Sequence, residues 1–212
     1  MKLLKIILAF SCLGFLNHAQ AMSVSWQGST AVMTSSQPFL TDWLAAYSFR
    51  NDMAVAGRIM RMTMSDGTVM KFYAAQFDYL ARRWNGTDYQ ANIYANAGFG
   101  AEDYLGRNST VGIGTLDIDV ESRELYAAGK IQGNWVGIGP NVYQGELRLG
   151  IAPYKAAYEE LASWFIVSIQ TNAQLSRAFS VTPMVRLFYK SVLAEVGSNI
   201  QGDWMLNTMI HF

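Results

Sequence analysis

The sequence predicts an all-β fold, a closed antiparallel transmembrane β-barrel of about ten to twelve strands. Only 15% of the residues are charged and 13% are aromatic, whereas soluble domains average about 25% charged residues. Beyond residue 21 no run of about 18 apolar residues marks a spanning helix. Apolar and polar side chains alternate instead with a period of two, as in half-buried strands. A closed barrel is then the structure that satisfies every backbone polar group within lipid.

Residues 1–21 are predicted to be a cleaved signal peptide. A positively charged start precedes a short apolar run at residues 6–16, and residues 19–21 (Ala-Gln-Ala) fit signal-peptidase cleavage. Removal of this segment takes away the single cysteine, Cys12, and two of the 16 basic residues, which leaves a net charge of about −2. We therefore expect no disulfide, no cofactor and no nucleic-acid partner, because no basic excess or stripe is present.

Alternating segments separated by turn residues predict a barrel domain over residues 41–212. In the clearest segment, Leu116, Ile118 and Val120 alternate with acidic residues. Residues 22–40 form an N-terminal segment or an extra strand, because 24–34 alternates weakly. Residues 191–198 would then supply a twelfth strand, since bacterial barrels favour even numbers. Residues 158–161 are expected to be briefly helical. The ten firm strands span 41–49, 53–64, 69–83, 88–99, 110–121, 124–136, 142–153, 163–172, 179–190 and 203–212.

The last residues of the chain share one apolar face. Trp204, Leu206, Ile210 and Phe212 alternate with other residues, and the aromatic Phe212 comes last. This pattern resembles the C-terminal assembly signal of Gram-negative outer-membrane β-barrel proteins. The resemblance implies export to the outer membrane, membrane lipids as surroundings, and the barrel-assembly machinery and periplasmic chaperones as partners during biogenesis. It implies a porin-like membrane class and no particular activity.

Histidine is scarce, which bears on catalysis. The sequence has two histidines, of which His18 leaves with the signal peptide and His211 is expected at the periplasmic rim. Outer-membrane lipid hydrolases and acyltransferases use a histidine base beside a serine, at the level of the outer leaflet. We therefore expect a non-enzymatic protein, either structural or a narrow channel for small solutes and ions. An enzyme that uses inward carboxylates is the alternative.

If the apolar residues of each strand face lipid, the charged residues that alternate with them point into the lumen. Both signs occur there, so we expect charge pairs that fill the barrel, with a selective cation path as the functional alternative. Arg58, Arg82 and Lys190 share this inward parity. The predicted lumen charge network consists of Asp117, Asp119, Lys130, Glu146, Arg148 and Arg186.

Six methionines also occupy positions that are predicted to point into the lumen. Because the last strand of a closed barrel pairs with the first, they are expected to lie around one seam. Thioether sulfur selects soft ions such as Cu(I), which makes a copper-binding or transport-linked barrel an alternative function. The preferred interpretation is that methionine fills irregular interior space, so no firm metal site is predicted. The residues are Met60, Met62, Met64, Met184, Met205 and Met209.

Overall fold

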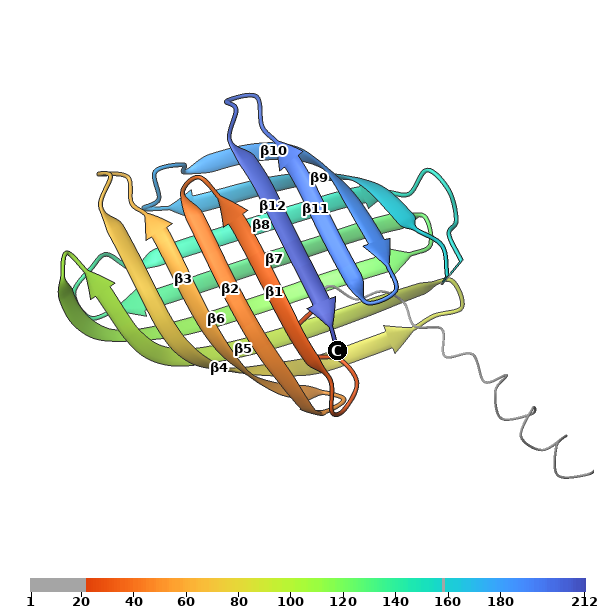
Figure 1. Cartoon of the computed structure of the whole chain (residues 1–212), viewed down its shortest axis with the longest axis horizontal. Coiled ribbons are helices and arrows are strands. Elements are labelled where there is room, and N and C mark those ends of the chain that lie inside the picture. The colour runs from red at the N-terminus through yellow and green to blue at the C-terminus, as the bar shows by residue number, and fades with distance from the viewer. Residues whose placement is uncertain (1–21, 158) are drawn as a thin grey trace, which may run out of the picture.

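Twelve antiparallel strands close into one barrel in the computed structural model, which describes residues 22–157 and 159–212 (Figure 1). The predicted fold class is confirmed. The predicted signal peptide lies outside the described residues. The strands are β1 (Thr30–Gln37), β2 (Leu40–Arg50), β3 (Met53–Thr63), β4 (Val69–Asn85), β5 (Tyr89–Tyr104), β6 (Arg107–Ser122), β7 (Leu125–Val136), β8 (Val142–Ile151), β9 (Ala162–Ala173), β10 (Phe179–Tyr189), β11 (Val192–Ser198) and β12 (Trp204–His211).

Each strand pairs with the next one along the chain, and β1 pairs with β12 to close the barrel. The optional strands predicted at 24–34 and 191–198 correspond to β1 and β11. The helical turn expected at 158–161 is not formed by residues 159–161, which lie in a turn and bend before β9. No helix in the described ranges has the length and apolar character needed to cross a membrane.

The two ends of the barrel differ in their connections. We call proximal the end where Thr30 N donates to Phe212 O at 3.2 Å, and distal the opposite end. Every distal connection is short, and two of them have only two residues. In one of these, Leu105 and Gly106 have φ of 53° and 72°, as a type I′ hairpin turn requires. The longest connection, 152–161, is proximal. The distal connections are 38–39, 64–68, 105–106, 137–141, 174–178 and 199–203.

The outer and inner faces of the wall differ in polarity. On β6, Ile118 points outward and is 48% exposed, whereas its neighbour Asp117 points inward and is 9% exposed. The same alternation on β12 places Trp204, Leu206, Ile210 and Phe212 outside. A closed wall with apolar side chains outside and polar side chains inside suits a lipid environment.

A β-bulge in β4 corrects one inward assignment. The register with β5 shifts between Leu80 and Arg82, so Arg82 is exposed and stacks on Trp84 with its guanidinium carbon 5.5 Å from the ring centroid. Arg83 takes the inward position and donates to Asn92 Oδ1 at 2.8 Å. One extra residue in a strand exchanges the inward and outward positions of all residues beyond it. Odd–even alternation in the sequence does not reveal this exchange.

Lys190 is a second correction. It lies in the turn after β10 with φ of 54°, is exposed, and pairs with Glu159 at 3.3 Å. Its side chain therefore lies outside the lumen, because the strand ends at Tyr189 and the alternation ends with it.

Apolar side chains fill the distal part of the lumen. They come from the distal halves of β3, β4, β6 and β8 and from three distal connections, 38–39, 64–68 and 174–178. All are buried, and Met62, Met70 and Val111 have no exposed surface. This distal plug consists of Phe39, Met60, Met62, Met64, Met70, Phe72, Ala74, Val111, Ile113, Val142 and Leu175.

Candidate functional site: the polar lumen

A cavity of about 230 Å³ lies inside the barrel, on the proximal side of the distal plug. Residues from most strands and Met22 and Ser23 of the N-terminal segment line it. Its wall is rich in amide side chains, among them Gln76, Gln132 and Gln144. The charged residues in the wall are the acids Asp42, Asp117, Glu146 and Glu195 and the bases Arg58, Lys130 and Arg148.

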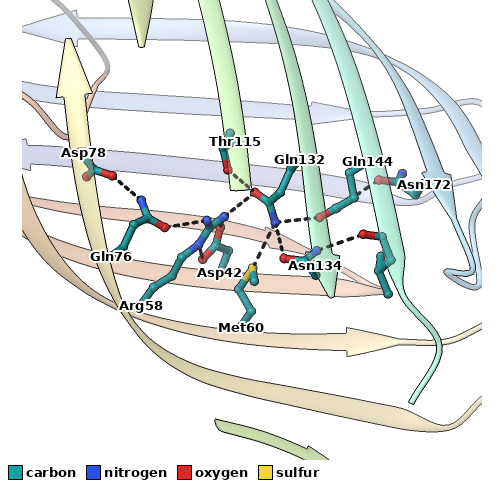
Figure 2. Close-up of polar contacts among 11 residues, drawn as sticks. Asp42, Arg58, Met60, Gln76, Asp78, Thr115, Gln132, Asn134, Gln144 and Asn172 are labelled. Carbon is teal, nitrogen blue, oxygen red and sulfur yellow. Dashed lines mark hydrogen bonds and ion pairs between the residues drawn. The ribbon is translucent and has the colours of Figure 1, made fainter. Parts of the chain in front are cut away.

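Arg58 is the centre of a hydrogen-bonded network that crosses the lumen, shown in Figure 2. Its Nη2 lies 2.7 Å from Asp42 Oδ2 on β2 and also donates to Gln132 Oε1 on β7 at 2.8 Å. Its Nη1 donates to Gln76 Oε1 on β4 at 3.0 Å. The guanidinium therefore joins strands on opposite walls. A buried cation of this kind is stable because carboxylate and amide oxygens replace its water.

Amide side chains extend this Arg58 network in both directions. On one side, Gln76 Nε2 donates to Asp78 Oδ1 at 2.6 Å. On the other, Gln132 Nε2 donates to Gln144 Oε1 at 3.2 Å, and Gln144 Nε2 donates to Asn172 Oδ1 at 3.2 Å (Figure 2). The result is a continuous polar band from β4 to β9.

A second network surrounds Glu195 on β11, and we call it the Glu195 cluster. Arg186 Nε donates to Glu195 Oε1 at 2.6 Å and Arg148 Nη1 donates to Glu195 Oε2 at 2.9 Å. Asn207 Nδ2 on β12 donates to the same carboxylate at 2.8 Å. Arg148 also holds Glu146, with Nε 2.7 Å from Oε1. Two arginines and two carboxylates thus join β8, β10 and β11.

The structure brings together half of the predicted lumen charge network. Glu146 and Arg148 form a direct ion pair, and Arg186 joins them through Glu195. Among the described residues, Asp117, Asp119 and Lys130 form no direct ion pair. Lys130 lies opposite both Asp117 and Glu146 in the strand register. The last member, Asp119, accepts instead from Asn92 Nδ2 at 2.7 Å.

Glu195 and the lumen amides are the site residues that sequence reasoning missed. The signal for Glu195 was present, because it lies between Leu193 and Gly197 on the inward parity of β11. Residues 191–198 are predicted only as an optional strand, so the one acid there is not assigned to the lumen. The amides carry no charge pattern. Their inward parity was visible, but their mutual contacts depend on the closure of the barrel.

The six predicted methionines are inside the barrel but do not share one seam. Met60, Met62 and Met64 belong to the distal plug, whereas Met184 and Met205 pack with Trp164 and Ile166. Met209 lies beside His211. Strands β1 and β2 separate β12 from β3, and strand tilt displaces neighbouring strands along the barrel axis. The single methionine site is therefore corrected to three separate groups.

No protein-family model matches the sequence, and no curated protein matches it. Among solved structures, the KdgM porin is similar at 12% identity and a TM-score of 0.47, covering 87% of this chain and 98% of that chain. The KdgM porin in complex with disordered oligogalacturonate has 12% identity, a TM-score of 0.46 and the same coverage. The third is OmpTdeltaL8, a loop L8 deletion mutant of OmpT, an outer membrane protein of Vibrio cholerae. It has 9% identity, a TM-score of 0.32 and the same coverage.

The fold is a closed, twelve-stranded antiparallel β-barrel. Its closure, its apolar outer face and its polar lumen are properties of this chain's own strands. At identities of 9% to 12%, no residue role is carried over from the similar structures.

Proposed function

We propose that this protein is a non-enzymatic barrel of the outer membrane whose lumen is a narrow pathway for small ions and small polar solutes. The observation that carries the proposal is the cavity of about 230 Å³, lined by amides and by charges of both signs. Charge pairs that only filled the lumen would leave no such space. Amide and carboxylate oxygens replace water around a solute that has lost part of its hydration shell.

The size of the cavity limits what it holds. Pockets for drug-sized ligands measure about 300–1,000 Å³, and one water occupies about 30 Å³ of liquid. A cavity of about 230 Å³ therefore suits a few waters, a partly hydrated ion or a small hydroxylated solute.

The charge of the lumen favours cations. Two of the bases in the cavity wall, Arg58 and Arg148, are already held by carboxylates. Acids also outnumber bases along the interior. The inward carboxylates are Asp42, Asp78, Glu102, Asp117, Asp119, Glu121, Glu146 and Glu195, and the inward cations are Arg58, Arg83, Lys130, Arg148 and Arg186. Rings of acidic side chains favour cation entry.

The distal plug gives this pathway a closed state. Apolar constrictions block ions by excluding water, although the backbone leaves room. We place the proximal end, where β12 ends at His211, in the periplasm, as the resemblance of this strand to the outer-membrane assembly signal implies. The plug then closes the lumen toward the outside. The short distal connections offer little surface for recognition of large ligands.

Planar lipid bilayers test this function. Purified, folded protein should give brief, small conductance steps in KCl, because the plug opens rarely. A Met62→Ser, Phe72→Ser variant should give longer and larger steps, since hydroxyl groups let water into the constriction. Absence of steps in both proteins, with folding shown by heat-modifiability on a gel, would contradict the channel. Fractionation with outer membranes tests the localisation separately.

A further inference from the structure

His211 and Met209 lie side by side on the inward face of β12, near the proximal end. The imidazole Nε2 is 3.2 Å from the thioether Sδ of Met209. His211 is 8% exposed and Met209 is 1% exposed. An imidazole nitrogen and a thioether sulfur therefore already point at one another in a largely water-free place.

A second thioether comes from the neighbouring strand. Met33 of β1 is directly opposite Met209 in the register. Both residues line the lumen cavity, so both side chains project to the same side of the wall. Directly opposed residues of an antiparallel pair have Cβ atoms about 4.5–5.5 Å apart, which is within the reach of two flexible methionine side chains.

An aromatic ring adjoins the pair. The indole of Trp26, in the segment before β1, has its centroid 5.7 Å from that of His211 and is tilted by 34°. Aromatic faces attract cations. The main chain holds this corner firmly, because Phe212 N donates to Thr30 O at 2.8 Å and His211 N donates to Ser191 O at 3.0 Å.

We propose that His211, Met209 and Met33 form a binding site for a soft monovalent metal ion, Cu(I) or Ag(I), at the proximal mouth of the lumen. Thioethers select soft ions, and imidazole also suits copper. Harder ions have weaker partners in this corner, since no group of three or more His, Cys, Asp or Glu side chains in the described ranges is arranged to hold a metal.

The observed separation suits two ligands of one ion. With the bond lengths of zinc sites as a guide, about 2.0–2.1 Å to nitrogen and about 2.3 Å to sulfur, a tetrahedral angle puts the two ligand atoms ~3.6 Å apart. The atoms in the structure are 3.2 Å apart, so a shift of a few tenths of an ångström accommodates the ion. Met33 completes three ligands, and the ion reaches them through the cavity.

Silver(I) titration of the folded, detergent-solubilised protein tests this site, because Ag(I) needs no reductant. The readout is the imidazole signal of ¹⁵N-histidine-labelled protein, in a His18→Gln background that leaves His211 as the single histidine. We expect saturation at one equivalent, a large shift of the His211 Nε2 resonance, and no such shift with Mg²⁺.

Three variants locate the ligands. Met33→Leu and Met209→Leu keep the volume and the apolar character of the side chain, and each should weaken Ag(I) binding by at least about 10-fold. Met62→Leu, in the distal plug, is the matched control and should leave the affinity unchanged. Met33 lies outside the C-terminal strand, so its substitution leaves the assembly signal intact.

Two results would overturn the metal site. One is the absence of any His211 shift in protein shown to be folded by heat-modifiability. The other is an unchanged affinity in the Met33→Leu, Met209→Leu double variant, which would show that silver binds elsewhere. Either result leaves the conductance expected for the lumen untouched, because the metal site and the pathway are measured separately.

Discussion

Arg58 and Asp42 form a two-point ion pair inside the barrel, with Nε 3.0 Å from Oδ1 and Nη2 2.7 Å from Oδ2. The same guanidinium reaches Gln132 on the opposite wall at 2.8 Å. This one side chain therefore neutralises an inward carboxylate and braces the lumen between β3 and β7. The polar interior thus contributes to the stability of the barrel as well as to its proposed pathway.

Removal of Arg58 should destabilise the barrel strongly. Arg58→Ala leaves Asp42 without its cation, and breaking a buried pair in this way costs about 3–5 kcal/mol. Chemical unfolding in detergent or lipid vesicles measures the free energy. The Arg58→Ala, Asp42→Asn double variant should recover part of the loss, because no uncompensated charge is left. Equal losses in the single and double variants would show that the two charges do not interact.

Glu195 should matter more to stability than any carboxylate predicted from the sequence. Glu195→Gln removes the negative charge between Arg148 and Arg186, which then repel one another in a buried place. We expect a loss of about 3–5 kcal/mol, measured by the same unfolding experiment. Asp119→Asn is the matched control, because Asp119 is held by an amide of Asn92 and loses no direct ion pair. A smaller loss for Glu195→Gln than for Asp119→Asn would contradict the assignment.

The distal plug should control the size and duration of the conductance steps. Leu175→Ser places a hydroxyl group in an otherwise apolar constriction and should raise the open fraction by admitting water. Met62→Leu keeps the plug apolar and should behave as the unmodified protein. Single-channel recording compares the two variants. Equal open fractions would place the closure elsewhere in the lumen.

The sequence predicts the faces of the strands well because alternation is a local property. It places Asp117 and Arg186 inside and Leu206 and Phe212 outside, as the structure has them. It fails at Arg82, where one extra residue in β4 exchanges the faces. A single sequence gives no reliable signal for a β-bulge. The prediction of which residues beyond the bulge point inward can therefore be shifted by one residue.

Contacts across the lumen are harder to predict than faces. The contact between Arg58 and Gln132 joins residues 74 positions apart, and it depends on the tilt and stagger of the whole barrel. For the same reason Met60 and Met205 share an inward parity but lie in different groups. Alternation within a single strand predicts the ion pair of Glu146 and Arg148, which lie two residues apart on β8, whereas closure of the barrel brings Glu195 to it.

Acid should weaken the distal connection that contains Asp203. Arg177 donates to Asp203 at 3.1 Å, and this contact lowers the pKa of the Asp203 carboxyl below its usual value. A carboxyl whose pKa is lower in the folded state stabilises the fold above its unfolded pKa of about 3.9, and the gain is lost as the pH falls through the folded value.

The Asp203 contribution should be small, because Arg177 is partly exposed and solvent screens such pairs to below about 1 kcal/mol. Asp203→Asn should lower the thermal midpoint slightly at pH 7, and by less at pH 2. A larger effect of the variant at pH 2 than at pH 7 would contradict the direction of the pKa shift.

The reversal potential of the open barrel tests the central claim most directly. The Met62→Ser, Phe72→Ser variant is recorded in a planar bilayer with a tenfold KCl gradient, so that current flows without the plug. The excess of inward carboxylates predicts a reversal potential of the sign that K⁺ selectivity gives. Adding Asp117→Asn to the plug variant should move the reversal potential toward zero. A reversal potential of the sign that Cl⁻ selectivity gives would contradict a cation pathway through this lumen.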